Sequence, residues 1–180
     1  MLIILDRDGV INHDSDQFIK SPEEWIPIPG SLEAIAKLKT AGHQVAIATN
    51  QSGLGRGLFS QETLELIHDK LNQSLAELGT SVDALVYCPH LPTDGCDCRK
   101  PKSGLMKQID TILQTGFKQS WVVGDSLRDL IAGAEVGCHT ILVGTGKGEK
   151  TLAAGGLPQN TEIVENLAAA VEFILDQTDD

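Results

Sequence analysis

The chain of 180 residues lacks features that would direct it to several classes of partner. No apolar run approaches the roughly twenty residues that a membrane-spanning helix needs. The amino terminus has no basic segment followed by an apolar stretch, so we expect no secretory leader. Its 14 basic residues stand against 25 acidic ones, and the net charge of −11 disfavours general binding to nucleic-acid phosphates. We therefore expect a cytoplasmic protein that binds neither membranes nor nucleic acids.

Short apolar runs alternate with amphipathic stretches along the chain. The apolar runs predict strands over residues 2–5, 45–48, 82–87, 121–123 and 140–143, with a short strand near residue 163. Helices are predicted over 32–40 after a Ser31 cap, from the Ser60 cap to 78, over 103–114, after Asp125 as far as 136, and over 167–175. The stretches 13–29 and 144–156 are predicted to be loops. The alternation indicates a single α/β domain over residues 1–180, with a Rossmann-like, doubly wound, mainly parallel sheet.

The first apolar run ends in two carboxylates, Asp6 and Asp8. In open α/β sheets ligands bind beyond the carboxyl ends of the strands, and residues i and i+2 of an extended segment point to the same side. Two carboxylates that face one pocket repel each other unless a cation lies between them or one of them is protonated. The pattern indicates a metal site with a carboxylate nucleophile. The alternative is a strand that runs into a polar turn.

Two later strands are also predicted to end in polar side chains. Thr49 and Asn50 end the second strand, where a hydroxyl and loop amides could hold phosphate oxygens or form an ordinary turn. Asp125 ends the fourth strand, and with Asp6 and Asp8 it can complete a metal site. An oxygen-only site of that kind suits Mg²⁺. Asp129, one helical turn later, would orient a cation or cap the helix.

A second cluster contains sulfur and nitrogen ligands. Its members are Cys88, His90, Cys96 and Cys98. Three thiolates and one imidazole in two close pairs can form a tetrahedral zinc site, and a reducing compartment disfavours disulfides between them. No ligand position is left for water, so we expect a structural zinc that braces the loop carrying Arg99 and Lys100. Unligated loop cysteines are the alternative, and Cys138 is predicted to be a small buried residue outside the cluster.

The order of the strand-end motifs, Asp-x-Asp, Thr, Lys and Gly-Asp-x-x-x-Asp, resembles that of the haloacid dehalogenase (HAD) superfamily of phosphohydrolases. The resemblance covers nearly the whole chain. Asp-Arg-Asp-Gly, Thr-Asn-Gln-Ser-Gly and Cys-Pro-His…Cys-Asp-Cys-Arg-Lys-Pro narrow it to a branch that acts on heptose bisphosphates or histidinol phosphate. It implies a phosphoric monoester hydrolase. The intervals where larger members insert a cap domain are too short here, so we expect a capless fold with a zinc-binding loop.

The resemblance also implies roles for individual residues. Asp6 would be the nucleophile that forms an aspartyl-phosphate, and Asp8 would protonate the leaving alkoxide and then activate water. Magnesium would be held by Asp6, the backbone carbonyl of Asp8, and Asp125. Thr49 and Lys100 would hold the transferring phosphoryl oxygens. The zinc ligands would be Cys88, His90, Cys96 and Cys98. Phosphoryl transfer needs charge stabilisation and alignment more than covalent chemistry, and Lys100 and magnesium would supply the charge.

Without a cap, substrate specificity is expected to come from the loops 14–25, 50–57 and 88–100. A second phosphate needs hydroxyl, amide and guanidinium donors, which Ser52 and Arg99 can supply, with Arg56 as a weaker candidate. The remaining predicted substrate-binding residues are Asp14, Asn50, Gln51 and Ser126. Ser126 departs from the lysine found in many heptose-phosphatase relatives, and Ser103 departs from their proline.

The branch leaves two substrates to choose between. Histidinol-phosphatase relatives usually carry Asp at the position of Ser52, where a carboxylate would suit an amino group. The resemblance therefore favours hydrolysis of the C7 phosphate of D-glycero-D-manno-heptose 1,7-bisphosphate, a precursor of the lipopolysaccharide core, with histidinol phosphate as the alternative. A phosphate-accepting receiver domain in signalling is the non-enzymatic alternative, but receivers place the phosphorylated Asp after a later strand. We expect a monomer, because no apolar surface stripe is evident.

Overall fold

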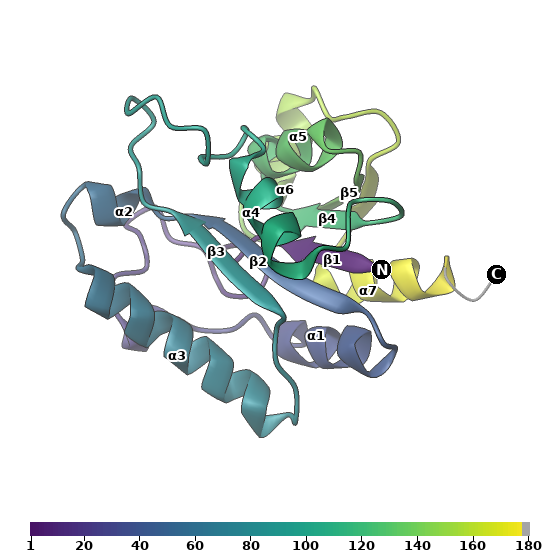
Figure 1. The fold of residues 1–180 in the computed structure, drawn as a ribbon, viewed down its shortest axis with the longest axis horizontal. Helices are drawn as coiled ribbons and strands as arrows, with labels where there is room; N and C mark the ends of the chain where they lie inside the picture. The colour runs from purple at the N-terminus through teal and green to yellow at the C-terminus, as the bar shows by residue number, and fades with distance from the viewer. Residues whose placement is uncertain (178–180) are drawn as a thin grey trace.

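Six parallel strands form the central layer of the protein. The computed structural model describes residues 1–177, and the last three residues of the predicted domain lie outside them. The strands are β1 (Leu2–Leu5), β2 (Gln44–Asn50), β3 (Ala84–Cys88), β4 (Trp121–Gly124), β5 (His139–Val143) and β6 (Glu162–Val164). Their order across the sheet is β3-β2-β1-β4-β5-β6, and every pair of neighbours is parallel (Figure 1). The predicted doubly wound parallel sheet is confirmed.

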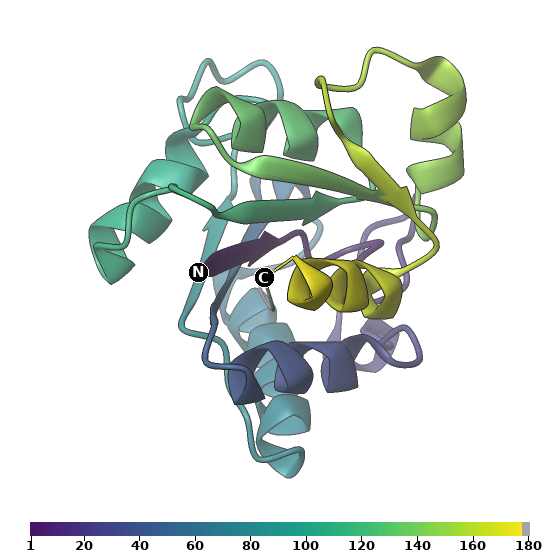
Figure 2. The same ribbon diagram turned by 90° about the vertical axis from the view of Figure 1, so that its right-hand side faces the viewer.

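Helices cover both faces of this sheet. They are the 3₁₀ turn η1 (Pro22–Glu24), α1 (Ser31–Thr40), α2 (Ser52–Gly55), α3 (Gln61–Glu77), α4 (Gly104–Leu113), α5 (Leu127–Glu135), α6 (Gly148–Ala154) and α7 (Leu167–Asp176). Figure 2 shows α1, α3 and α7 on one face of the sheet, and α4 and α5 on the other. Among the described residues, no helix is long and apolar enough to cross a membrane.

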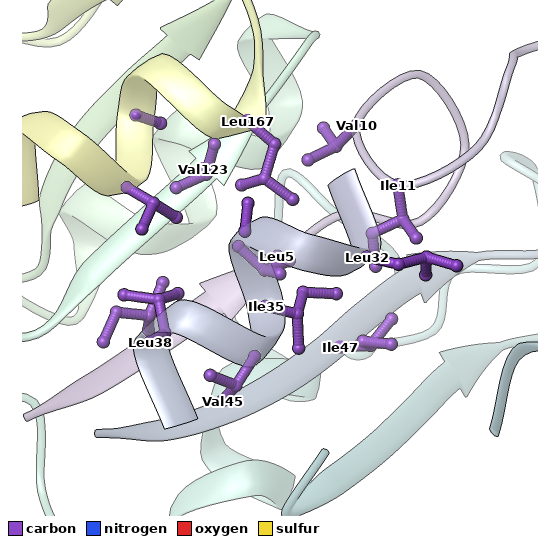
Figure 3. Close-up of a cluster of buried hydrophobic side chains, with 14 of the residues drawn as sticks. Leu5, Val10, Ile11, Leu32, Ile35, Leu38, Val45, Ile47, Val123 and Leu167 are labelled. Atoms are coloured by element: carbon purple, nitrogen blue, oxygen red, sulfur yellow. The ribbon is translucent and has the colours of Figure 1, made fainter. Parts of the chain in front are cut away.

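The central strand β1 is buried on both faces. Ile3 and Leu5 belong to the hydrophobic cluster that packs under α1, α3 and α7, whereas Leu2 and Ile4 face α4 and α5. Figure 3 shows the first of these clusters, with Ile35 of α1 among the side chains beside the sheet. Each fully buried Leu or Ile contributes on the order of 1.5–3 kcal/mol to folding. The continuous apolar run before Asp6 is thus explained by burial on two faces.

Two local expectations were wrong. Ser31 was predicted to cap α1, but the capping position is Gly30 at φ 86°, and the Ser31 hydroxyl instead donates a hydrogen bond to the carbonyl of Val10 (2.9 Å). Residues 144–156 were predicted to be a loop, but residues 148–154 form α6. The many glycines indicated a loop, whereas a tertiary contact stabilises the helix, because the Thr151 hydroxyl donates to the carbonyl of Asp125 (2.8 Å).

The sheet has its topological switch point between β1 and β4. From β1 the chain builds outward through β2 and β3, and from β4 it builds in the opposite direction through β5 and β6. Leu5 and Val123 are register partners, and the backbone N–H of Asp6 extends the ladder by donating to the carbonyl of Val123 (3.0 Å). The segments that follow β1 and β4 therefore leave the sheet side by side, where open α/β sheets bind their ligands. This places Asp6 next to Asp125.

Candidate active site

A polar cavity lies beyond the carboxyl ends of the strands, at the switch point. Its lining residues are Asp6, Asp8, Asp14, Ser15, Asp16, Phe18, Ile19, Thr49, Asn50, Gln51, Ser52, Arg56, Arg99, Lys100, Asp125, Arg128 and Lys147. They come from five separate segments of the chain. Of the residues predicted to act on substrate, every one except Ser126 lines this cavity. The structure therefore brings the strand-end motifs together, as parallel strands require.

Lys100 is the buried cation of the cavity, with only 2% of its surface exposed. Its ammonium group donates to Asp6 Oδ1 (2.9 Å) and to the carbonyl of Ala48 (2.6 Å), and it forms an ion pair with Asp129 Oδ1 (2.8 Å). Burial by itself would lower the pKa of Lys100, but the carboxylates of Asp129 and Asp6 raise that pKa above its ordinary value. The lysine therefore stays charged.

The backbone of Lys100 is held by Asn50 at the end of β2. The N–H of Lys100 donates to Asn50 Oδ1 (3.0 Å), and Asn50 Nδ2 donates back to the carbonyl of Lys100 (3.1 Å). Next to it, the amide of Gln51 donates to Thr49 Oγ1 (2.9 Å), and Ser52 begins the short helix α2. The predicted phosphate-binding turn after β2 thus also fixes the segment that carries the lysine.

Three carboxylates gather around the lysine. One oxygen each from Asp6, Asp125 and Asp129 lies within 4.8 Å of the others. Burial and the neighbouring Asp129 carboxylate raise the pKa of Asp6 to about 6, and burial together with Asp6 and Asp129 raises the pKa of Asp125 to about 8. When all three carboxyl groups are ionised, they leave two negative charges against the one ammonium of Lys100. A divalent cation with oxygen ligands fits this imbalance, and Mg²⁺ is such a cation.

Asp8 has a different environment from the other carboxylates. It accepts hydrogen bonds from Arg7 Nε (2.9 Å) and Nη2 (3.2 Å), from Asn12 Nδ2 (2.9 Å) and from Gln51 Nε2 (3.0 Å). Burial tends to raise the pKa of Asp8, but the guanidinium of Arg7 and these donors bring it below the ordinary value. Its side chain is therefore held ionised, outside the three-carboxylate group. The predicted magnesium contact of Asp8 involves its backbone carbonyl.

Asp129 performs both of the tasks that the sequence left open. It binds Lys100, and its Oδ2 accepts hydrogen bonds from the backbone N–H (3.1 Å) and the hydroxyl (2.9 Å) of Ser126 in a capping box at the start of α5. Ser126 was predicted to bind substrate. In the structure its hydroxyl donates a hydrogen bond to Asp129, and Ser126 does not line the cavity. The capping box thus fixes the carboxylate that holds the lysine.

Glycine is required where Asp125 packs against bare backbone. A Cβ atom on Gly9, which has φ +88°, would lie 2.0 Å from Asp125 Oδ2, and a Cβ atom on Gly146, which has φ +57°, would lie 2.2 Å from it. The backbone N–H of Lys147 also donates to Asp125 Oδ2 (2.8 Å). The loop after β1 and the loop after β5 therefore close around this carboxylate.

Two cavity residues were not predicted from the sequence. Lys147 lies in the loop after β5, and its ammonium pairs with Asp14 Oδ2 (3.2 Å). Nothing in its sequence neighbourhood pointed to the site, because its position depends on how the loop packs against Asp125. Arg128 carried a signal, since it lies in the first helical turn after the strand-end Asp125. Residues of that turn face the carboxyl edge of the sheet.

The predicted zinc ligands also come together. The distances between ligand atoms are 3.1 Å for Cys88–Cys98, 3.3 Å for His90–Cys98, 3.5 Å for Cys88–His90 and 3.7 Å for Cys88–Cys96. A tetrahedron with zinc bonds of about 2.0–2.3 Å separates its ligand atoms by about 3.3–3.8 Å. All of these cysteines are free thiols. Three of the four distances fall in this range and Cys88–Cys98 is slightly shorter, so the cluster is of the right size for a tetrahedral zinc ion.

Comparisons with known proteins agree with this site. Residues 97–170 match the model of a family described as HAD-hydrolase-like. The family match, the parallel sheet, the strand-end carboxylates and relatives of high sequence identity place the chain in one class of enzymes. The chain belongs to the HAD-like hydrolases.

Several relatives of high sequence identity share one name, D-glycero-beta-D-manno-heptose-1,7-bisphosphate 7-phosphatase. The protein of that name from Bordetella bronchiseptica is 56% identical over 98% of both chains, and that from Pseudomonas putida is 55% identical over 97% of this chain and 99% of its own. A crystal structure of D,D-heptose 1,7-bisphosphate phosphatase from B. bronchiseptica, complexed with magnesium and phosphate, has a TM-score of 0.95 at 56% identity and covers 98% of both chains.

Proposed function

We propose that the protein hydrolyses the C7 phosphate of D-glycero-β-D-manno-heptose 1,7-bisphosphate. The names of the relatives support this substrate and its β anomer. The observation that carries the proposal is the composition of the cavity, which combines the Asp6–Lys100 pair with the guanidinium groups of Arg56 and Arg99. A single cavity with donors for two anions suits a sugar with two phosphates.

Asp6 would attack the phosphorus atom. Its Oδ1 accepts hydrogen bonds from the backbone N–H of Arg7 (2.9 Å) and from Lys100 (2.9 Å), and within residues 1–177 its Oδ2 accepts none. A bond forms between a carboxylate oxygen of Asp6 and phosphorus while the bond from phosphorus to the C7 oxygen breaks. Lys100 and Thr49, which line the cavity beside Asp6, would hold the phosphoryl oxygens during the transfer.

Asp8 would move the protons. It gives a proton to the C7 alkoxide as that alkoxide leaves phosphorus, and in the second step it takes one from the water that attacks phosphorus and releases Asp6. The hydrogen bonds from Arg7, Asn12 and Gln51 keep its carboxylate ionised and oriented in the free protein. That state is ready for the second step, and the first step requires Asp8 to gain a proton when substrate binds.

Magnesium would be held by the carboxylates of Asp6 and Asp125 and by the backbone carbonyl of Asp8. When bound, it would supply positive charge that stabilises the phosphoryl oxygens. The raised pKa values of Asp6 and Asp125, which arise from burial and from the crowding of like charges, support a cation at this place. Zinc at Cys88, His90, Cys96 and Cys98 would be structural.

We also propose that residues 1–180 form one catalytic domain that acts as a monomer in the cytoplasm. The monomer is carried over from the sequence, in which no apolar surface stripe is evident. The support for the cytoplasm is the set of free thiols, since zinc-binding thiolates persist in a reducing compartment. Light scattering at the assay concentration measures the oligomeric state.

Phosphate release measured side by side on several substrates tests the function. The panel contains both anomers of heptose 1,7-bisphosphate, heptose 7-phosphate, fructose 1,6-bisphosphate and histidinol phosphate, each with Mg²⁺. We expect the highest kcat/KM for the β-anomeric heptose bisphosphate, and Asp6→Asn should abolish release from every substrate. A higher kcat/KM for histidinol phosphate would replace our proposal with the alternative that the sequence left open.

A further inference from the structure

The buried guanidinium group of Arg7 lies between Asp8 and His68. Its Nε and Nη2 donate to Oδ1 (2.9 Å) and Oδ2 (3.2 Å) of Asp8, and its Nη1 lies 3.0 Å from Nε2 of His68. Arg7 has 0% of its surface exposed and His68 has 8%. Neither residue lines the cavity, and His68 belongs to α3, which packs on one face of the sheet. Arg7 therefore connects this helix to a carboxylate of the cavity.

The contact between Arg7 and His68 has a defined direction. A guanidinium group carries N–H donors and no acceptor, so Nε2 of His68 must accept the hydrogen bond and the ring proton must be on Nδ1. Burial, and then the charge of Arg7, lower the pKa of His68 to about 3, in agreement with a neutral ring. His68 therefore acts as a neutral acceptor for the arginine.

Arg7 determines the orientation of the Asp8 carboxylate. Each carboxylate oxygen accepts two hydrogen bonds, Oδ1 from Arg7 and Asn12 and Oδ2 from Arg7 and Gln51. Arg7 contacts both oxygens, and paired bonds of this kind fix the plane of a carboxylate. An arginine side chain has many rotamers, so a further contact is needed to hold it in one of them. His68 supplies that contact from another edge of the guanidinium group.

We propose that His68 is a positioning residue for the reaction, because it fixes the guanidinium of Arg7 and thereby the carboxylate of Asp8. This inference rests on the proposed function, in which Asp8 moves the protons, and it adds a residue outside the cavity on which that step depends. Without the acceptor, a buried N–H of Arg7 would have no partner, and the guanidinium would turn away from Asp8 to reach another one. Proton transfer is sensitive to such a displacement, because a misplacement of about 1 Å can reduce the rate about 100-fold.

The test measures kcat and KM for β-anomeric heptose 1,7-bisphosphate with Mg²⁺. His68→Phe keeps a buried ring and removes the acceptor, so its kcat should fall about 10- to 100-fold while its KM changes little. His68→Gln should recover most of the kcat, because its amide oxygen can accept the hydrogen bond from Arg7. His68→Leu, which also lacks an acceptor, takes the place of His68→Phe if that variant does not fold.

Two comparisons separate positioning from a purely structural role. Leu71→Ala removes fully buried atoms from the same helix, so it should lower the melting temperature and leave kcat unchanged at temperatures where the variant is folded. Arg7→Gln should lower kcat, and adding His68→Phe to it should lower kcat little further, because residues that act as a unit are not additive. Three results would each overturn the inference: wild-type kcat in folded His68→Phe, no recovery of kcat in folded His68→Gln, or losses that multiply in the double variant.

Asp8→Asn distinguishes failure of this inference from failure of the proposed function. Wild-type kcat in Asp8→Asn, or no release of phosphate from heptose bisphosphate by the wild type, would overturn both. A large loss of kcat in Asp8→Asn together with wild-type kcat in His68→Phe would overturn the positioning role of His68 alone.

Discussion

Lys100 has three oxygen partners in the interior of the protein. Its ammonium contacts Asp6, Asp129 and the carbonyl of Ala48, which come from three separate segments of the chain. The lysine therefore has a structural and a chemical role at the same time. Removing one member of a buried ion pair leaves an uncompensated charge, which typically destabilises a protein by about 3–5 kcal/mol.

We therefore expect Lys100→Met to reduce both stability and activity. The free energy of unfolding, measured with urea, should fall by about 3 kcal/mol or more, and kcat/KM should fall at least about 100-fold. Adding Asp129→Asn removes one of the two charges left unpaired, so the double variant should regain part of the stability and none of the activity. If the double variant is less stable than Lys100→Met, the ion pair is not the source of the effect.

His68 contacts Arg7, the residue whose guanidinium group binds Asp8. Its Nε2 is 3.0 Å from Nη1 of Arg7, whose side chain is completely buried. Burial, and then the Arg7 guanidinium, lower the pKa of His68 to about 3. In the unfolded chain a histidine has a pKa of about 6.5. Between these two values the unfolded state binds the extra proton, so the contribution of His68 to stability is complete above pH 6.5 and is lost as the pH falls.

We expect His68→Gln to weaken the acid sensitivity of folding. The free energy of unfolding is measured with urea at pH 7.5 and at pH 5.0 for the wild type and the variant. The decrease between the two pH values should be smaller in His68→Gln, by up to about 2 kcal/mol. The exposed His13 offers a matched control, and His13→Gln should keep the wild-type decrease. An equal decrease in all three proteins would show that His68 is protonated freely in the fold.

The zinc-binding loop is a separate element that packs directly on α4. A Cβ atom on Gly104 would lie 2.3 Å from the carbonyl oxygen of Asp97, so the loop touches the helix backbone. The ammonium of Lys102, which follows the loop, donates a hydrogen bond to the carbonyl of Cys96 within it (2.7 Å). Cys98, the last predicted ligand, is followed at once by Arg99 and Lys100. Metal binding would therefore fix the backbone from which two cavity cations extend.

We expect the variant Cys96→Ser/Cys98→Ser to lose zinc and most of its kcat/KM while its far-UV circular dichroism stays near that of the wild type. Elemental analysis measures the zinc content. Adding Lys100→Ala to this variant should reduce kcat/KM little further, since residues that act as a unit are not additive. Two losses that multiply independently would show that the zinc loop does not position Lys100. Near-normal activity without zinc would limit the metal to stabilising the fold.

The helices and strands differ in how far they could be predicted. The central strands β1 and β4 were predictable because strands buried on both faces leave continuous apolar runs. The strand-end residues Asp6, Thr49 and Asp125 meet because parallel strands end at one edge. Helix α6 was missed, since its stability depends on the contact between Thr151 and the backbone of Asp125. The same loop carries Lys147. Local composition cannot report such contacts between distant segments.

At the scale of the whole molecule, the sheet is built outward from its middle. β1 pairs with β2 and with β4, and β4 follows β1 by more than a hundred residues. The cavity includes residues from both halves of this arrangement. A continuous fragment of the chain that contains Asp6, Lys100 and Asp125 therefore also contains β2, β3 and β4.

The order of the strands has a consequence for synthesis on the ribosome. At about 5–20 residues per second, β1 would wait roughly 5–25 s for β4 to emerge, with one edge unpaired and apolar on both faces. We expect stalled nascent chains that end before β4 to be digested readily by protease, and chains in which β4 has emerged from the ribosome to become resistant. During that interval α1 and β2 are the elements that cover the first strand and keep it from pairing with other chains.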